Sequence, residues 1–405
     1  MAEAHEGREA GPARLASVLL ENGALTSDWL PAYEAVPREA FVPDVFWPGR
    51  GGARQGRAID RTAEPEAWRE AVYSDRSLTT QYDDGAHTGP EPGTSPSCSN
   101  SQPTMVFSML ATLDAAPGHK ALEVGTGTGW CTALLCERLG SPHVFTVEVD
   151  PQNAQWARQA LRRKGYAPTT VVGDGAEGYA PAAPYDRVLF TASVRDVPQA
   201  AVRQTRPGGL IVAPYAPTYG AGAVVQLTVG EDGTASGPFV GGASFMRLRQ
   251  QRSNRRHTRE YLAGNDWPAD AVRSRTALSP EDVGDWLPMF VLGLRTSGVF
   301  PWAEQYGDTG AYTLWLRDEA VTSWATVDYD PDVTEFVVYQ DGPRHLWDEV
   351  EAAFAWWTEQ GRPGYARFGL TVAPDGIHTP WLDSPLNPVK ASAREGLVWP
   401  TPPVA

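Results

Sequence analysis

The sequence predicts an α/β fold in which a Rossmann-like, doubly wound parallel sheet is followed by an extra C-terminal α+β domain. Two observations predict it. Between residues 120 and 229, apolar segments of strand length alternate with helical segments, as parallel strands and their crossover helices do. The chain of 405 residues also continues far beyond that region and exceeds what one hydrophobic core usually supports, so a second domain is expected.

The composition fits a folded protein that does not bind nucleic acid. The hydrophobic fraction of 42% is enough for a packed interior, and most of the 15 tryptophans must help to build it. Asp and Glu number 49 against 34 Lys and Arg, and the resulting net charge of −15 argues against wrapping around a polyanion.

The cysteines and the apolar segments exclude other classes. Cys98, Cys131 and Cys136 form no CxxC pair and are odd in number, so neither a disulfide framework nor a metal site is expected. The N-terminal residues lack the basic and apolar blocks of a signal peptide, and no later segment is apolar for long enough to cross a bilayer. We therefore expect a cytoplasmic protein without membrane contact, and a monomer is favoured.

The N-terminal part predicts two helices and then a long irregular stretch. Apolar residues recur at helical spacing over 13–41, up to a turn at 36–38. Residues 43–101 are rich in Gly, Pro, Ser and Asp, and only 67–73 are helical in pattern. Loops of this length are usually lids or binding loops, so residues 1–110 are expected to supply helices and substrate loops.

Residues 111–249 contain the predicted sheet. Strands and helices alternate at its start, over 120–124, 130–139, 144–148 and 152–164. Asp150 can cap the second of these helices and Gly165 can end it. Further strands are expected at 170–172, 187–190, 210–214, 224–229 and 240–245.

Residues 250–405 are expected to form the C-terminal extension, a possible site for a peptide substrate. Strands are predicted at 312–316 and 335–339, and a helix over 346–358. Arginines gather where the extension begins: Arg247, Arg249, Arg252, Arg255, Arg256 and Arg259. They form either a basic surface that attracts a carboxylate-bearing substrate or a solvated linker.

Three glycines at alternate positions follow the first predicted strand. Gly125, Gly127 and Gly129 stand between that strand and a helix, where glycine lets the backbone pass close to a ligand and helix N–H groups point at it. The third glycine comes too early for the dinucleotide fingerprint. The spacing therefore indicates a cofactor site and counts against NAD.

Glu148 and Asp174 end the next two predicted strands. Glu148 can accept hydrogen bonds from both ribose hydroxyls of an adenosine, and Asp174 stands where it can read the adenine edge. Each also has a structural interpretation, because Glu148 can be a solvated strand end and Asp174 a turn former. Their joint occurrence, in order and at strand ends, favours an adenosine site.

Several segments resemble protein-L-isoaspartate O-methyltransferases, in that family's order, over residues 15–249. They are Val36-Pro-Arg-Glu-Ala-Phe-Val-Pro43, Ser101-Gln-Pro-Thr-Met105, the glycine-rich loop, Val147-Glu148, Gly173-Asp174-Gly175 and Arg206-Pro-Gly-Gly209. The resemblance implies the class I S-adenosylmethionine-dependent methyltransferase fold, with S-adenosyl-L-methionine as cofactor and S-adenosyl-L-homocysteine as product. The cofactor-binding residues expected from it and from the loop are Glu123, Gly125, Thr126, Gly127, Gly129, Glu148, Asp174, Gly175 and Thr191.

The resemblance gives Ser101 the catalytic place. In that family the Ser of the Ser-x-Pro segment lies near the transferred methyl group and the acceptor carboxylate. Ser101 can instead be the N-cap of a helix that begins at Pro103. The residues expected to bind substrate are Thr80, Ser99, Gln102, Arg255 and Arg256.

The long C-terminal part resembles family members that tailor ribosomally made peptides (RiPPs) of the lanthipeptide, lasso peptide and graspetide classes. Repair enzymes of the family generally stop near Arg249. Residues 95–100, which include Cys98, and residues 75–85 also depart from the repair enzymes. This resemblance implies that an aspartyl carboxylate of a modified precursor peptide is esterified, and that an aspartimide (succinimide) forms, which persists or hydrolyses to isoaspartate. The alternatives are isoaspartyl repair and a non-catalytic protein that keeps the fold to bind a partner.

Overall fold

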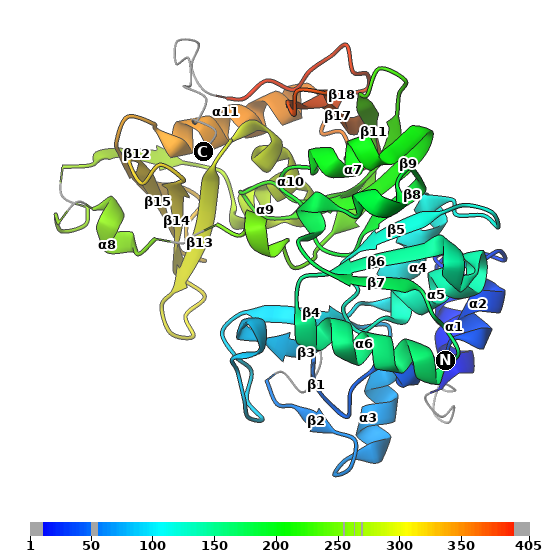
Figure 1. Ribbon diagram of the computed structural model, residues 1–405. Helices are drawn as coiled ribbons and strands as arrows, with labels where there is room; N and C mark the ends of the chain where they lie inside the picture. Colours follow the sequence, from blue (N-terminus) through cyan, green and yellow to red (C-terminus); the bar gives the residue numbers. More distant parts are fainter. Residues whose placement is uncertain (1–10, 50–55, 254–255, 263, 269, 393–405) are drawn as a thin grey trace, which may run out of the picture.

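The computed structural model is built on one large sheet (Figure 1). It describes residues 11–49, 56–253, 256–262, 264–268 and 270–392. The sheet has nine strands in the order β18-β17-β11-β10-β9-β8-β5-β6-β7. Their bounds are β5 Ala121–Val124, β6 Val144–Glu148, β7 Thr169–Val172, β8 Tyr185–Phe190, β9 Thr205–Tyr215, β10 Gly222–Val229, β11 Ala235–Ala243, β17 Phe368–Val372 and β18 His378–Leu382.

The parallel half of this sheet carries the predicted βα units. β5 pairs in parallel with β6 on one side and β8 on the other, while β7 and β9 extend the two edges in parallel. The chain order therefore reverses between β5 and β8, which is the switch point of a doubly wound sheet. The expected strands of the core are confirmed, and β10 and β11 continue the sheet antiparallel.

The helices that follow β5 and β6 begin and end as their residues predict. α5 (Trp130–Leu139) starts directly after Gly129, and α6 (Pro151–Arg163) starts after Asp150. The Asp150 carboxylate accepts hydrogen bonds from the N–H groups of Gln152 and Asn153, which confirms it as the N-cap.

Both faces of the sheet are buried, and each has its own core. Because neighbouring strand residues point to opposite faces, Leu189 and Val212 pack with the N-terminal helices, whereas Val188 and Ile211 pack with the C-terminal part of the chain. The first core includes α1 (Pro12–Glu21), α2 (Leu30–Ala35) and α4 (Pro103–Leu113).

The stretch expected to be irregular contains a small antiparallel sheet. Its strands β1 (Val45–Pro48), β2 (Ile59–Asp60), β3 (Leu78–Tyr82) and β4 (Pro96–Asn100) are ordered β2-β1-β3-β4, and α3 (Pro65–Val72) packs beside them. The expectation of a mainly irregular stretch was wrong here, because the strands are short and rich in Thr, Ser, Gln and Pro and so lack an alternating apolar pattern.

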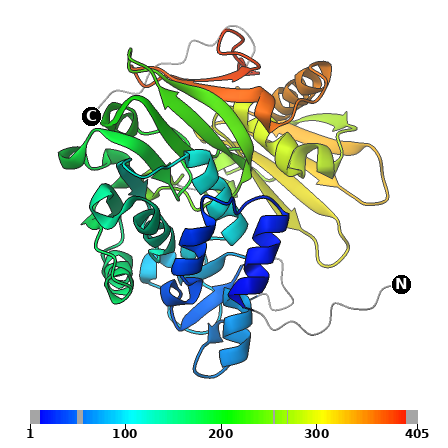
Figure 2. The same cartoon turned by 90° about the vertical axis from the view of Figure 1, so that its right-hand side faces the viewer.

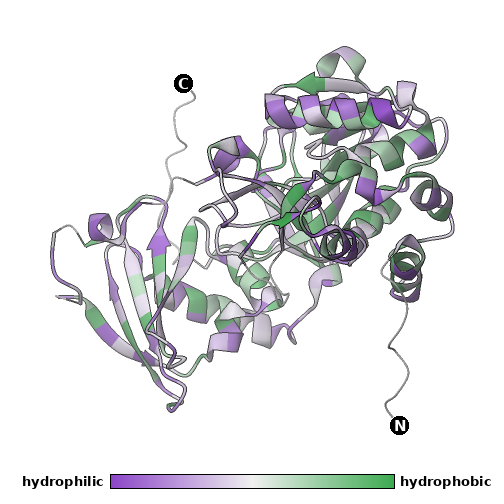
Figure 3. Ribbon diagram, turned by 90° about the horizontal axis from the view of Figure 1, so that it is seen from below, coloured by the Kyte–Doolittle hydropathy of each residue, from purple (hydrophilic) through white to green (hydrophobic). Residues whose placement is uncertain are grey.

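A five-stranded antiparallel sheet follows the main sheet in sequence (Figure 2). Its strands lie in the order β12-β16-β15-β14-β13. Their bounds are β12 Val272–Thr276, β13 Val299–Gln305, β14 Tyr312–Asp318, β15 Trp324–Tyr329 and β16 Phe336–Asp341. α10 (Trp286–Arg295) and α11 (Leu346–Glu359) pack against each other beside it. Figure 3 shows hydrophobic and hydrophilic residues alternating along these strands. The two predicted strands and the helix of this region are confirmed, while β12, β13 and β15 were not predicted.

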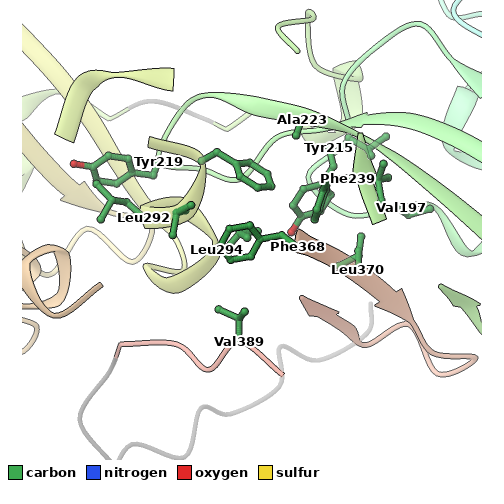
Figure 4. Close-up of a cluster of buried hydrophobic side chains, with 14 of the residues drawn as sticks. Val197, Tyr215, Tyr219, Ala223, Phe239, Leu292, Leu294, Phe368, Leu370 and Val389 are labelled. Atoms are coloured by element: carbon green, nitrogen blue, oxygen red, sulfur yellow. The ribbon is translucent and has the colours of Figure 1, made fainter. Parts of the chain in front are cut away.

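The chain then returns to the main sheet. The expected domain boundary at residue 249 does not account for this return. β17 pairs with β11, and β18 pairs with β17. Figure 4 shows Phe368 and Leu370 of β17 in one cluster with Phe239 of β11 and Leu294 of α10. The extension thus shares a hydrophobic core with the sheet. Among the described residues, no helix combines the length and apolar character needed to span a membrane.

Candidate active site

A cavity of about 1540 Å³ lies at the carboxyl ends of β5, β6 and β8. Ligands of open α/β sheets bind at this place, where the strand order reverses. The cavity is larger than the ~300–1,000 Å³ that a small-molecule pocket usually needs. It therefore has room for more than a nucleoside.

The three glycines of the loop after β5 have different tasks. Gly125 and Gly127 line the cavity with positive φ angles of 103° and 53°, which favour glycine. A side chain on Gly125 would come within 2.6 Å of the Thr191 hydroxyl. Gly129 does not line the cavity, and its Cα faces Ala157 of α6, with 3.2 Å from a built Cβ to that methyl group. The third glycine thus serves helix packing.

Glu148 presents its carboxylate at the cavity wall from the end of β6. One oxygen accepts the Gly127 N–H at 2.8 Å, and the other accepts the Asp150 N–H at 3.0 Å. Burial raises the pKa of this carboxyl. Since a carboxylate has about four acceptor sites, both oxygens retain capacity for two neighbouring hydroxyl groups, as the ribose interpretation requires.

Thr126, Gly175 and Thr191 also line the cavity, as expected. A Cβ on Gly175 would lie 2.4 Å from a methyl group of Val124, so only glycine fits there. The Thr191 hydroxyl donates to the Gly125 carbonyl and fixes the start of the loop.

Besides Gly129, two more of the expected cofactor residues do not reach the cavity. Asp174 accepts the Ala176 N–H at 2.8 Å and shapes a turn, which is its structural interpretation. Glu123 is fully buried beneath the loop, where one oxygen accepts from the hydroxyls of Thr132 and Thr146 at 2.5 and 2.8 Å. Burial raises its pKa to about 7. Side chains alternate along β5, so Val124 takes the cavity position instead.

Ser101 lines the cavity and is not the N-cap of α4. Gln102 occupies the cap position, and Asp75 serves the first turn by accepting the Thr104 N–H at 2.8 Å. The Ser101 carbonyl accepts from Arg38 at 2.9 Å. Its hydroxyl makes no hydrogen bond within the described part of the chain and so remains available to a ligand. Asp75 was missed by the sequence analysis, since it lies far from α4 in the chain.

Only some of the residues expected to bind substrate line the cavity. Ser99 and Gln102 line the cavity. Thr80 does not, although its neighbours Thr79 and Tyr82 in β3 do. Arg255 lies outside the described residues. Arg256 is exposed away from the cavity and lies 3.6 Å from Glu260.

Three arginines of the expected cluster do line the cavity, namely Arg247, Arg249 and Arg252. Arg249 pairs with Asp84 at 3.0 Å and with Asp150 at 2.8 Å, and Arg252 pairs with Asp84 at 2.8 Å. These pairs tie the turn after β3 to the main domain across the rim of the cavity.

The C-terminal part also contributes to the wall. Trp286, the first residue of α10, and Phe300 of β13 both line the cavity, and Trp286 is 54% exposed. This contribution could not be predicted, because both residues lie far along the chain from the glycine loop and from Ser101.

Comparison with known proteins agrees with this geometry. Residues 56–252 match the family model described as protein-L-isoaspartate(D-aspartate) O-methyltransferase. The chain is 33% identical to the protein-L-isoaspartate O-methyltransferase of Hyperthermus butylicus over 217 residues, which are 51% of this chain and 75% of the relative. It is 45% identical to the enzyme of that name from Ignicoccus hospitalis over 116 residues. This match covers only 28% of this chain and 55% of that relative.

A solved structure titled protein-L-isoaspartate O-methyltransferase shares the fold. It has a TM-score of 0.51 and 18% identity, and the match covers 92% of this chain and 100% of that one. This coverage extends well beyond residue 252, so the shared fold includes part of the C-terminal region. The class I methyltransferase fold is confirmed. The extent of the match to the Hyperthermus relative establishes that the chain belongs to the protein-L-isoaspartate(D-aspartate) O-methyltransferase family.

Proposed function

We propose that this chain is an S-adenosylmethionine-dependent carboxyl O-methyltransferase that acts on aspartyl or isoaspartyl residues of peptides. One observation carries the proposal. A free hydroxyl, that of Ser101, lines the same cavity as the glycine loop and the Glu148 carboxylate. The cavity thus joins a place for an adenosine to a place for an acceptor.

The residues present fit the cofactor. Because Gly125 and Gly127 have left-handed backbones without side chains, a ligand can come close to the backbone of the loop. A side chain at Gly175 would collide with Val124 beside the cavity. Glu148 would hold the ribose hydroxyls, and Gly125, Gly127 and Thr191 would border the rest of the nucleoside. When bound, S-adenosylmethionine supplies a methyl group on a positively charged sulfur.

The acceptor needs orientation and little else. An aspartyl carboxyl has an ordinary pKa of about 3.9, so it is ionised at neutral pH and needs no general base. A bound cofactor would supply the methyl group to one carboxylate oxygen, and its sulfur would keep the electron pair of the broken carbon–sulfur bond. Ser101 would donate a hydrogen bond that orients the carboxylate. Met105, Val106 and Met109 of α4 line the cavity with apolar groups that exclude water.

We further propose that the natural acceptor is an L-aspartate of a modified precursor peptide. The large cavity, with Trp286 and Phe300 in its wall, has room for a peptide around the acceptor. After esterification, the next backbone amide nitrogen attacks the ester carbonyl, methanol leaves, and an aspartimide results. Repair of isoaspartyl residues is the second candidate, and the names of the relatives favour it.

Matched peptides that carry either L-aspartate or L-isoaspartate at one position separate the two candidates. Each is incubated with the protein and S-adenosylmethionine and followed by mass spectrometry. A transient gain of one methyl group on the L-aspartyl peptide, followed by a net loss of water, supports the precursor-peptide proposal. Methylation confined to isoaspartyl peptides assigns the chain to repair instead.

A further inference from the structure

Arg247 differs from the other two arginines of the cavity wall because it has no carboxylate partner among the described residues. Arg249 and Arg252 are both paired with acidic side chains. Arg247 donates one hydrogen bond, from Nη2 to the Pro217 carbonyl at 3.3 Å, and its Nη1 is buried without a described partner. A desolvated charge is costly unless it is paired, so this cavity-lining guanidinium is only partly satisfied by the described residues.

The nearby carboxylate of Asp196 is already engaged. Arg195 pairs with Asp196 at 2.9 Å and with Glu319 of the C-terminal part at 2.8 Å. Arg195 also disfavours the charged state of its neighbour, so that burial first and then this second cation lower the pKa of Arg247. Asp196 offsets this effect only in part, and its carboxylate is already paired with Arg195.

The backbone holds Arg247 at a fixed place. Ser193, just after β8, donates to the Met246 carbonyl at 2.7 Å and accepts from the Leu248 N–H at 3.0 Å. Residues 246–248 therefore run beside the carboxyl end of β8, and the Arg247 side chain reaches the loop at Pro217.

The same loop packs on the C-terminal part. A Cβ on Gly293 of α10 would lie 2.4 Å from the Pro217 ring, and Figure 4 shows Tyr219 of this loop beside Leu292 of α10. Trp286 at the start of α10 lines the cavity together with Pro217 and Arg247. The cavity lining thus includes both a guanidinium with no carboxylate partner among the described residues and an exposed aromatic ring.

We propose that Arg247 binds a second carboxylate of the acceptor peptide, distinct from the one that is methylated. This inference rests on the proposed function. The planar guanidinium binds carboxylates through paired N–H groups. A pair with the reacting carboxylate would weaken as methylation removes its charge, so it would stabilise the substrate more than the transition state. A second carboxylate keeps its charge throughout, and it comes either from an Asp or Glu side chain or from the peptide C-terminus.

Four synthetic peptides around one acceptor test the proposal, each made in an aspartyl and an isoaspartyl version. They combine a flanking Glu or Gln with a C-terminal acid or amide. Binding to the full-length protein saturated with S-adenosylhomocysteine is measured by fluorescence anisotropy, which needs no turnover. We expect a carboxylate at the recognised position to tighten binding about 10- to 100-fold over its neutral counterpart, and Arg247→Gln to abolish this preference. Arg203→Gln, at an exposed arginine of α7 (Gln199–Gln204) that does not line the cavity, should retain it.

The comparison of the peptides shows which carboxylate Arg247 binds, and it distinguishes a failure of this proposal from a failure of the proposed function. A preference set by the flanking residue identifies a side chain, and one set by the terminus identifies the C-terminal carboxylate. Equal binding of all four peptides to the wild-type protein would overturn the proposal, as would an Arg247→Gln effect that is the same for neutral and charged peptides. Arg247→Lys, which keeps the charge, should keep part of the preference if the Gln variant does not fold. Charge-dependent binding without methylation of any peptide would count against the proposed function and not against Arg247.

Discussion

Arg38 donates a hydrogen bond from Nε to Oδ1 of Asn100 at 2.7 Å, and both side chains are almost fully buried. The Asn100 amide in turn donates to the Thr128 hydroxyl at 2.9 Å, and Arg38 also donates to the Ser101 carbonyl. These hydrogen bonds link three segments that are far apart in the sequence, and they place Ser101 next to the glycine loop.

Arg38→Lys should destabilise the protein by about 3 kcal/mol or more, because an ammonium group cannot replace the guanidinium fork and leaves buried acceptors without donors. Chemical denaturation measures the loss. Arg203→Lys, at the exposed position on α7, is the matched control and should change the free energy of unfolding little. A similar small change for Arg38→Lys would show that the network is dispensable.

Ser101→Ala should lower kcat/KM by about 10- to 100-fold, the range expected when a hydrogen bond to a charged group is lost. Affinity for S-adenosylhomocysteine should stay the same, since the cofactor place is formed by other residues. Ser108→Ala on α4 is the control, because Ser108 does not line the cavity. Unchanged methyl transfer in Ser101→Ala would remove Ser101 from the site.

Glu148→Gln should weaken the binding of S-adenosylhomocysteine by about 10- to 100-fold, as measured by calorimetry. The amide places an N–H₂ group where the Gly127 or Asp150 N–H needs an acceptor, and it also removes the charge that favours the ribose hydroxyls. Glu177→Gln, at an exposed glutamate in the turn after β7, should bind normally. Normal binding by Glu148→Gln would place the ribose elsewhere.

Glu123 should make stability depend on pH. Burial raises its pKa from 4.5 to about 7, so between these values the folded state holds a proton that the unfolded state has released. The free energy of unfolding contributed by this group therefore falls as pH rises through that window, by on the order of 3 kcal/mol, and levels off above pH 7.

The difference in unfolding free energy between the wild-type protein and Glu123→Gln isolates this effect, because the amide does not titrate. Relative to the variant, the wild-type protein should lose stability from pH 4.5 to 7. The difference between the wild-type protein and Ser108→Ala, which removes no titratable group, should stay flat. A flat difference for Glu123→Gln as well would mean that Glu123 is ionised in the folded state.

The parallel strands could be predicted because they are buried on both faces and read as short apolar runs. The small N-terminal sheet could not, since β3 and β4 contain Thr, Ser and Gln, and the aromatic contacts that support them come from distant residues. Trp47, for example, packs its ring on Tyr82 at 5.2 Å.

The residues of the cavity also fall into those that a local pattern predicts and those that depend on distant contacts. The positions of Gly125, Gly127 and Glu148 in the cavity wall were predictable because strand ends in a doubly wound sheet meet at one edge. The places of Asp75, Trp286 and Arg247 depend on contacts between segments far apart in the chain, which no local pattern records.

The return of β17 to the edge of β11 has a consequence for synthesis. The ribosome must translate the whole five-stranded sheet after β11 before the strand that covers that edge exists. Until then the nascent chain exposes unpaired backbone groups of β11, which invite pairing with another chain. Production of this protein should accordingly depend on chaperones that shield the growing chain.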